Sequence, residues 1–190
     1  DIMGLRPLFD DLCARLANEN GWAGCAIEPW PGNQDQPLEW KLANVGTLSD
    51  ERLLGDAVQA ADATGFGTVG IIGFCMGGMV TFKASSTGRF AAAAGFYGMI
   101  RMPEQWRSPT LGEPLDALAA RTCPVMAIVG TADVWTPPDD VVALEATGAT
   151  VVRYEGAEHG FIHDPTRPTH RAEDAADAWA KVIEFLNSVE

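Results

Sequence analysis

The chain has 190 residues, of which 47% are hydrophobic and 21% are charged, and its formal net charge is −13 at pH 7. Its size and composition are typical of one soluble globular domain. The acidic balance argues against nucleic acid and anionic membrane surfaces as partners, because no basic stripe is present to neutralise phosphates. No stretch approaches the length of a transmembrane helix, and we expect a monomer or a small homo-oligomer.

The four cysteines, Cys13, Cys25, Cys75 and Cys123, are scattered and form no C-x-x-C motif. This usage favours a reducing compartment over a disulfide framework, so we expect a cytoplasmic location. Cys13 lies on a helical pattern, whereas Cys25 and Cys123 lie in apolar runs, so we expect these three to be small buried hydrophobes. The three histidines show no metal-ligand spacing, and we expect neither a metal nor an organic cofactor.

Hydrophobic periodicity predicts helices and strands that alternate along the whole chain. The expected helices cover residues 5–20, 50–63, 76–83, 139–146 and 169–189, and Ser49 is expected to cap the second of them. The expected strands cover residues 22–27, 68–72, 90–97, 124–129 and 150–155. This alternation predicts a single α/β domain over residues 1–190, with a mainly parallel sheet covered by helices on both faces.

Two proline-containing stretches lack a clear period. Residues 29–48 are predicted to be a long surface loop, and residues 99–121 a cap or lid segment over the site. Four tryptophans, Trp30, Trp40, Trp106 and Trp135, lie in or near the predicted loops. They either line a substrate pocket, with Trp135 the foremost candidate, or serve as ordinary packing residues.

The stretch Gly73-Phe74-Cys75-Met76-Gly77 joins an expected strand to an expected helix. It has the spacing of the nucleophile elbow, G-x-S-x-G, with cysteine in place of serine. A nucleophile on so sharp a turn adopts strained dihedral angles, and its neighbours must lack side chains. The turn also places Cys75 at a helix N-terminus, which favours a thiolate. The alternative interpretation is a buried cysteine in a glycine-rich turn.

Two further polar side chains follow other expected strands. Asp133 comes shortly after the strand at 124–129, and His159 comes shortly after the strand at 150–155. Because active sites of open α/β sheets lie at the carboxyl ends of the strands, we expect both to lie near Cys75. The order nucleophile, acid, histidine is that of the α/β-hydrolase triad. Taken singly, Asp133 has an alternative interpretation as a turn cap, and His159 as a surface loop residue.

Several motifs together resemble the dienelactone hydrolase family. They are Gly73-Phe74-Cys75-Met76-Gly77-Gly78, Phe96-Tyr97-Gly98, Gly130-Thr131-Ala132-Asp133 with Pro137, and Tyr154-Glu155-Gly156-Ala157-Glu158-His159-Gly160-Phe161. In addition, Asp1-Ile2-Met3-Gly4-Leu5 resembles the family's loop in which an acidic residue precedes an apolar pair and a glycine. The resemblance covers nearly the whole chain. It implies an α/β-hydrolase fold and hydrolysis of a small ester or lactone without a metal or organic cofactor.

The resemblance also implies a role for each matching residue. Cys75 is expected to be the nucleophile, His159 the general base, and Asp133 the acid that orients it. The oxyanion of the tetrahedral intermediate is expected to accept hydrogen bonds from the backbone N–H groups of Met76 and Ile2.

Further residues are expected near the substrate. Asp1 stands where an acidic residue of the family helps to activate the thiol. His163 stands near the place of an arginine that binds a substrate carboxylate, and it is the rival of His159 for the role of base. Lys41 and Arg101 are other candidate sources of positive charge. Tyr97 either touches the substrate or packs in the core.

The family has an N-terminal hairpin and a central strand before the loop that matches Asp1, and the sequence contains neither. That strand lies between those expected at 22–27 and 68–72. Backbone groups left unpaired and buried there cost about 1–3 kcal/mol each. We therefore expect the domain to be N-terminally incomplete, with a further segment upstream of Asp1.

Two other classes of function stay open. One is a catalytically weak relative that acts as a binding or regulatory protein, and the other is a thiol redox sensor that uses Cys75. The expected pair of Asp133 and His159 favours hydrolysis, because a sensor needs no positioned acid and base. The leading prediction is a cysteine-dependent hydrolase of small-molecule esters or lactones.

Overall fold

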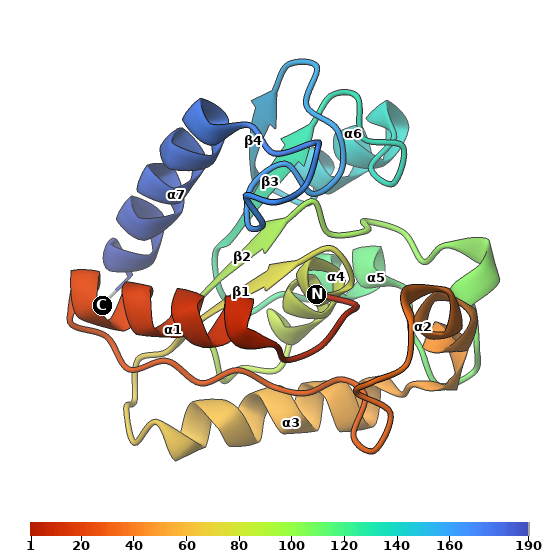
Figure 1. The fold of residues 1–190 in the computed structure, drawn as a ribbon, viewed down its shortest axis with the longest axis horizontal. Helices are drawn as coiled ribbons and strands as arrows, with labels where there is room; N and C mark the ends of the chain where they lie inside the picture. The colour runs from red at the N-terminus through yellow and green to blue at the C-terminus, as the bar shows by residue number, and fades with distance from the viewer. Residues whose placement is uncertain (190) are drawn as a thin grey trace.

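The computed structural model describes residues 1–189 and is built around a four-stranded parallel sheet (Figure 1). The strands lie side by side in chain order: β1 (Gly70–Phe74), β2 (Ala92–Phe96), β3 (Val125–Gly130) and β4 (Thr150–Tyr154). All three neighbouring pairs are parallel. The expected parallel sheet is confirmed, and the strand bounds differ from the predicted ones by at most a few residues.

Helices cover both faces of the sheet. In Figure 1, α1 (Pro7–Asn20) and α7 (Ala172–Asn187) lie together on one side. The opposite face is covered by α3 (Asp50–Ala63), α4 (Met76–Ala84), α5 (Pro114–Ala119) and α6 (Pro138–Ala146). As predicted, the Ser49 hydroxyl caps α3 by accepting a hydrogen bond from the Arg52 N–H.

The two faces follow from the two-residue period of the strands. Ile72 and Phe74 of β1 belong to the core under α1 and α7, whereas Ile71 packs in the core on the side of α3 and α4. The small side chains of β2 let α4 come close, since a Cβ on Gly95 would lie 2.3 Å from the Phe82 ring. This contact holds α4, the helix that follows the elbow, close against β2.

The predicted long surface loop at 29–48 is wrong in part. It contains α2 (Leu38–Asn44) and the short 3₁₀ helix η1 (Val45–Thr47). Lys41 of α2 is fully buried, and its ammonium donates hydrogen bonds to the carbonyls of Met3 and Gln34 at 2.7 and 2.8 Å. A helix held by a buried lysine shows no hydrophobic period, which explains why the pattern did not reveal it.

Residues 99–121 contain the 3₁₀ helix η2 (Glu104–Trp106) and α5. The segment is anchored by apolar side chains, among them Met102, Trp106 and Leu118, which are at most 3% exposed. The Trp106 indole N–H donates to the Leu42 carbonyl, which ties the segment to α2. Its action as a cap or lid stays a prediction.

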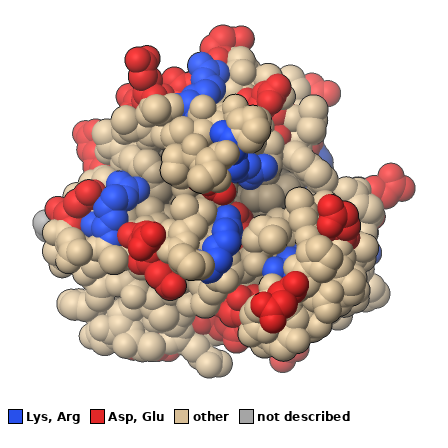
Figure 2. All heavy atoms as spheres, in the orientation of Figure 1, with Lys and Arg blue, Asp and Glu red and all other residues tan. Residues whose placement is uncertain are grey.

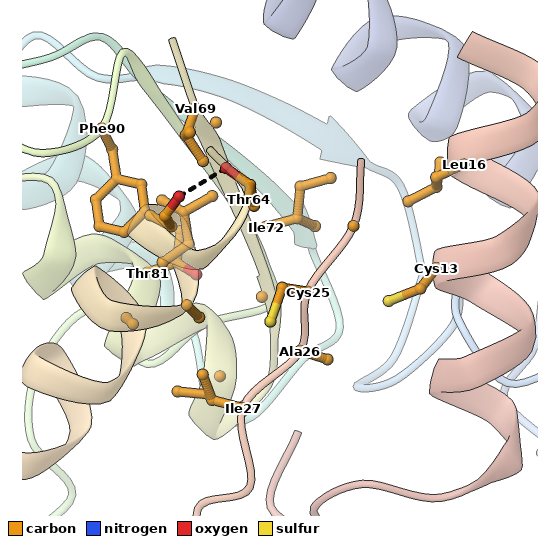
Figure 3. A pocket seen from close by; sticks show the side chains of 18 of the residues that line it. Cys13, Leu16, Cys25, Ala26, Ile27, Thr64, Val69, Ile72, Thr81 and Phe90 are labelled. Atoms are coloured by element: carbon orange, nitrogen blue, oxygen red, sulfur yellow. Dashed lines mark hydrogen bonds between the residues drawn. The ribbon is translucent and has the colours of Figure 1, made fainter. Parts of the chain in front are cut away.

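The predicted strand at 22–27 is wrong. The segment pairs with no described residue, and a cavity of about 730 Å³, lined by this segment and by all of β1, separates the two. Figure 3 shows the segment with Cys13 and Leu16 of α1 on one side and Ile72 on the other. Cys25 is exposed rather than buried because no neighbouring strand covers it. The further segment expected upstream of Asp1 stays a prediction.

The surface is predominantly acidic, as the net charge requires. Figure 2 shows Asp and Glu side chains scattered over one face, mostly towards its rim, with a few Lys and Arg near its centre. Among residues 1–189, no helix is long and apolar enough to cross a membrane.

Two glycines in helix interiors test how tightly α4 is packed. A Cβ on Gly78 of α4 would lie 2.8 Å from the Gly98 Cα and 2.9 Å from the Phe96 carbonyl oxygen, whereas a Cβ on Gly55 of α3 meets no atom within 4 Å. We predict that Gly78→Ala lowers the free energy of unfolding by about 1–3 kcal/mol. The control Gly55→Ala should raise it by about 0.5–1 kcal/mol through helix propensity. Urea unfolding of both variants measures this, and equal effects would contradict the packing described for α4.

Candidate active site

The turn from β1 into α4 holds Cys75 in a conformation that few residues adopt. Cys75 has φ 56° and ψ −123°, in the region of positive φ. A Cβ on Gly73 would lie 2.1 Å from the Gly77 carbonyl oxygen, so β1 and α4 pass each other only because residue 73 is a glycine. The backbone of the elbow is therefore the strained turn that the motif predicts.

The loop of residues 1–4 lies against the first turn of α4. A Cβ on Gly77 would approach the Asp1 nitrogen to 3.4 Å, and Ile2 and Met76 belong to one apolar cluster that Cys75 also contacts. The first N–H groups of a helix have no partner within the helix. The backbone N–H groups expected to hold the oxyanion, those of Met76 and Ile2, thus come from adjoining segments.

Asp133 and His159 are brought together by the ends of β3 and β4. His159 Nδ1 and Asp133 Oδ2 are hydrogen-bonded at 2.8 Å, and the carboxylate is fully buried. Asp133 also caps its own turn, because its Oδ1 accepts from the Trp135 N–H at 2.9 Å. The two interpretations of Asp133, turn cap and partner of a histidine, therefore both hold.

The other nitrogen of His159 faces away from Asp133. His159 Nε2 is buried and makes no hydrogen bond of standard geometry to a described residue. The Cys75 thiol nevertheless lies near enough for the two groups to shift each other's pKa. The arrangement therefore joins a thiol, an imidazole and a carboxylate in one row.

Electrostatics favours the charged form of both partners. Burial opposes ionisation of Cys75, but His159 and the Met76 N–H outweigh burial and lower the pKa of the thiol. Burial likewise lowers the pKa of His159, yet the hydrogen bond with Asp133 and the interaction with the Cys75 thiolate raise it to about 9. The pair can accordingly exist as thiolate and imidazolium at neutral pH, which is the reactive state of a cysteine nucleophile.

The second histidine of this loop has different partners. The His163 side chain is fully buried; its Nδ1 is hydrogen-bonded to the Tyr97 hydroxyl and its Nε2 to Asp1 Oδ2, the latter at 2.8 Å. Burial and nearby positive charges, Arg6 and Arg167 among them, lower the pKa of His163 to about 3. Both of its nitrogens are thus occupied away from Cys75, unlike Nε2 of His159.

Asp1 is held by a residue that the sequence did not single out. The guanidinium of Arg6 donates to both Asp1 oxygens, at 2.8 and 2.9 Å. The side chain of Asp1 is only 6% exposed. Arg6 stands at the N-cap position of α1 without a side-chain cap. Its spacing of five residues from Asp1 does not indicate the pairing from the sequence.

Aromatic rings surround His159. The Tyr97 ring meets it edge-on with centroids 5.1 Å apart, and the half-buried Trp135 lies 6.3 Å away and stacks on Trp106. Tyr97 is itself fully buried, and Trp106 and Trp30 are at most 3% exposed. Of the expected pocket residues, Trp135 and the half-buried Trp40 are thus more open to a substrate than Tyr97.

The two basic residues suggested for a substrate carboxylate are already engaged. Lys41 is buried on backbone carbonyls, and Arg101 is paired with Asp140 at 3.0 Å. Within residues 1–189, no cluster of His, Cys, Asp and Glu side chains is arranged to hold a metal ion.

Comparison with known proteins identifies relatives over the full chain. The model of the dienelactone hydrolase family matches residues 1–190. A candidate carboxymethylenebutenolidase of Synechocystis is 35% identical over 126 residues, which are 63% of this chain and 50% of that protein. A Bradyrhizobium protein described as a probable 2-oxo-3-(5-oxofuran-2-ylidene)propanoate lactonase is 30% identical over 97% of this chain and 79% of its own length.

A solved structure shares the architecture as well. The crystal structure of a candidate dienelactone hydrolase from Klebsiella pneumoniae superposes with a TM-score of 0.83 at 27% identity. The superposition covers 98% of this chain and 83% of that one. The sheet and helices described above therefore form an α/β-hydrolase fold.

The strain at Cys75 predicts an inverted order of stability. Alanine normally makes a folded chain more stable than glycine, because glycine has more freedom when unfolded. At φ 56° and ψ −123°, however, any Cβ is strained, so Cys75→Gly should be more stable than Cys75→Ala by about 1–2 kcal/mol. Thermal or urea unfolding of the two variants measures the difference, and a more stable alanine variant would show that the turn is unstrained.

The pKa shifts predict how thiol alkylation depends on pH. A lowered thiol pKa means that the thiolate persists at lower pH, so iodoacetamide should modify Cys75 of the wild-type protein rapidly at pH 7. His159→Ala removes the imidazolium that stabilises the thiolate, so the rise of the alkylation rate should move to about pH 8.5 or above. Mass spectrometry of the Cys75 peptide separates this thiol from exposed Cys25. An unchanged pH profile would contradict coupling of Cys75 and His159.

Proposed function

Because the chain belongs to the dienelactone hydrolase family and is a hydrolase, we propose that it cleaves small esters or lactones through Cys75, His159 and Asp133. The observation that carries this proposal is the His159–Asp133 hydrogen bond of 2.8 Å beside a cysteine on a strained elbow. A buried carboxylate on one imidazole nitrogen leaves the other nitrogen to exchange a proton with the thiol.

In the first half-reaction, the Cys75 thiolate attacks the ester carbonyl carbon. A C–S bond forms and the carbonyl electron pair moves to oxygen, where the N–H groups of Met76 and Ile2 stabilise the charge. Collapse of this intermediate breaks the C–O bond of the ester. The His159 imidazolium gives its proton to the departing alkoxide, and an acyl thioester remains on Cys75.

Water completes the cycle. Neutral His159 takes a proton from a water molecule, whose oxygen attacks the thioester carbonyl. The C–S bond then breaks, the carboxylic acid leaves, and the released Cys75 thiolate again faces the His159 imidazolium, which keeps the proton taken from water. Asp133 holds the imidazole in one orientation and stabilises its cation through both half-reactions.

The two loop residues considered as partners of a substrate carboxylate are occupied by other groups. Lys41 and Arg101 are engaged in other contacts, and the aromatic Trp135 lies beside His159. The named relatives suggest lactones as the class to test first. A panel that pairs neutral esters and lactones with carboxylate-bearing ones identifies the preferred substrate, and we expect the neutral members to have the higher kcat/KM.

We also propose that the substrate is a small molecule and that the protein is cytoplasmic. All four cysteines are free in the structure. A catalytic thiol requires a reducing compartment, because oxidation removes the nucleophile.

Hydrolysis of p-nitrophenyl acetate tests the proposal. The wild-type protein should turn over the ester, and both iodoacetamide and Cys75→Ala should abolish this turnover, because no other group replaces the thiolate. His159→Ala should lower kcat by about 10²–10⁴-fold, the usual contribution of a positioned acid and base. Iodoacetamide treatment of Cys25→Ser, which keeps Cys75, controls for effects at the exposed thiol, and its turnover should be lost as in the wild-type protein.

The outcomes separate the classes of function. Turnover that survives in Cys75→Ala would overturn the proposed nucleophile. An inactive wild-type protein whose Cys75 is reversibly oxidised by hydrogen peroxide would indicate a thiol sensor, and an inactive, unreactive one a binding protein.

A further inference from the structure

Four side chains outside the row of Cys75, His159 and Asp133 form a second buried chain of hydrogen bonds. Tyr97 at the end of β2 contacts His163 of the loop after β4; His163 contacts Asp1, and Asp1 is paired with Arg6 at the start of α1. Tyr97 and the His163 side chain are 0% exposed. The chain therefore joins three segments that are distant in the sequence.

The protons of this chain have one favourable arrangement. Arg6 is always charged, so the Asp1 carboxylate between it and His163 is an ionised acceptor. His163 Nε2 must then carry a hydrogen, and because burial keeps His163 neutral, its Nδ1 accepts from the Tyr97 hydroxyl. In each of these hydrogen bonds the donor is the residue farther from Asp1 along the chain of contacts. This arrangement fixes the orientation of each side chain.

Asp1 in turn fixes the loop to which it belongs. Its Oδ1 accepts from the Met3 N–H at 2.9 Å, and its carbonyl accepts from the Gly4 N–H at 3.2 Å. The Trp30 indole N–H donates to the Ile2 carbonyl at 2.7 Å. Among the hydrogen bonds of residues 1–189, the N–H of Ile2 donates to no protein acceptor. It is left open beside the start of α4.

We propose that His163 and Tyr97 are positioning residues that hold the Asp1–Ile2 loop so that the Ile2 N–H stabilises the oxyanion. This inference rests on the proposed function, because it assigns a role in the same acyl transfer. An oxyanion donor acts only when it lies where charge develops, and a displacement of about 1 Å can cost about 10²-fold in rate. Asp1 is then the acceptor that orients the loop, and the thiol is activated by His159.

The test compares two reactions of the same thiol. Ester hydrolysis needs the oxyanion donors, whereas alkylation by iodoacetamide needs only the thiolate. We expect Tyr97→Phe to lower kcat for p-nitrophenyl acetate about 10-fold and His163→Leu about 100-fold, with KM little changed, because the lost interaction is made in the transition state. The alkylation rate of Cys75 and its pH profile should stay those of the wild-type protein.

Two further variants separate positioning from simple loss of stability. Tyr154→Phe also removes a tyrosine hydroxyl that makes a side-chain hydrogen bond, here to the Asp177 carboxylate at 2.6 Å, and that hydroxyl has no hydrogen bond to residues 1–4. We expect it to lose thermal stability while keeping the wild-type kcat. His163→Gln keeps an N–H for Asp1 and should recover part of the kcat lost in His163→Leu. If His163→Leu does not fold, Tyr97→Phe carries the test.

The results that overturn the inference differ from those that overturn the proposed function. An unchanged kcat in Tyr97→Phe would show that the chain does not position the loop. A parallel fall in hydrolysis and alkylation would show that it acts on the thiol instead. A wild-type protein without thiol-dependent hydrolysis would remove the proposed function, and this inference with it.

Discussion

The site depends on the close approach of β1, α4 and the end of β2. Gly73 lets β1 and α4 pass, and Gly78 and Gly98 let α4 lie against the end of β2, where a Cβ on Gly98 would come within 2.5 Å of the Gly78 carbonyl carbon. This packing forces Cys75 to a positive φ. The strain is retained because the surrounding contacts over-determine it, and the thiol is thereby presented at a helix N-terminus.

Two histidines four residues apart, His159 and His163, have different roles because their neighbouring groups differ. His159 contacts Asp133, and its pKa rises to about 9, whereas burial and nearby positive charges lower the pKa of His163 to about 3 although it contacts Asp1. The first is suited to carry a proton between thiol and substrate. The second stays neutral and serves as a bridge with a fixed donor and a fixed acceptor. The same residue type therefore supports two roles, because its partners differ.

The sequence was informative where local pattern decides the structure. The four strands of the sheet, the elbow around Cys75 and the positions of Asp133 and His159 after their strands all follow from period, glycine spacing and order. It was uninformative where distant contacts decide. The strand expected at 22–27 needs a partner that no described residue supplies, and α2 is held by the buried Lys41.

The pairing of Asp1 with Arg6 and His163 is another feature that the sequence does not reveal. Nothing in the spacing of these residues indicates that they meet, because the contact between Asp1 and His163 spans nearly the whole chain. Resemblance to the family located Asp1 and His163 near the site, and only the structure gives their partners. The sequence can thus indicate which loop residues lie near the site, but not which distant side chains hold that loop in place.

The central claim is that Cys75 carries the acyl group during turnover, and acid quenching of the reaction tests it most directly. The wild-type protein is mixed with p-nitrophenyl acetate, quenched within the first turnover and examined by mass spectrometry. We predict an acetyl group on the Cys75 peptide as a thioester that hydroxylamine removes, together with a burst of nitrophenol equal to the enzyme concentration when deacylation is slow. Steady hydrolysis with unmodified Cys75, or an acetyl group on another residue during catalysis, would contradict the account.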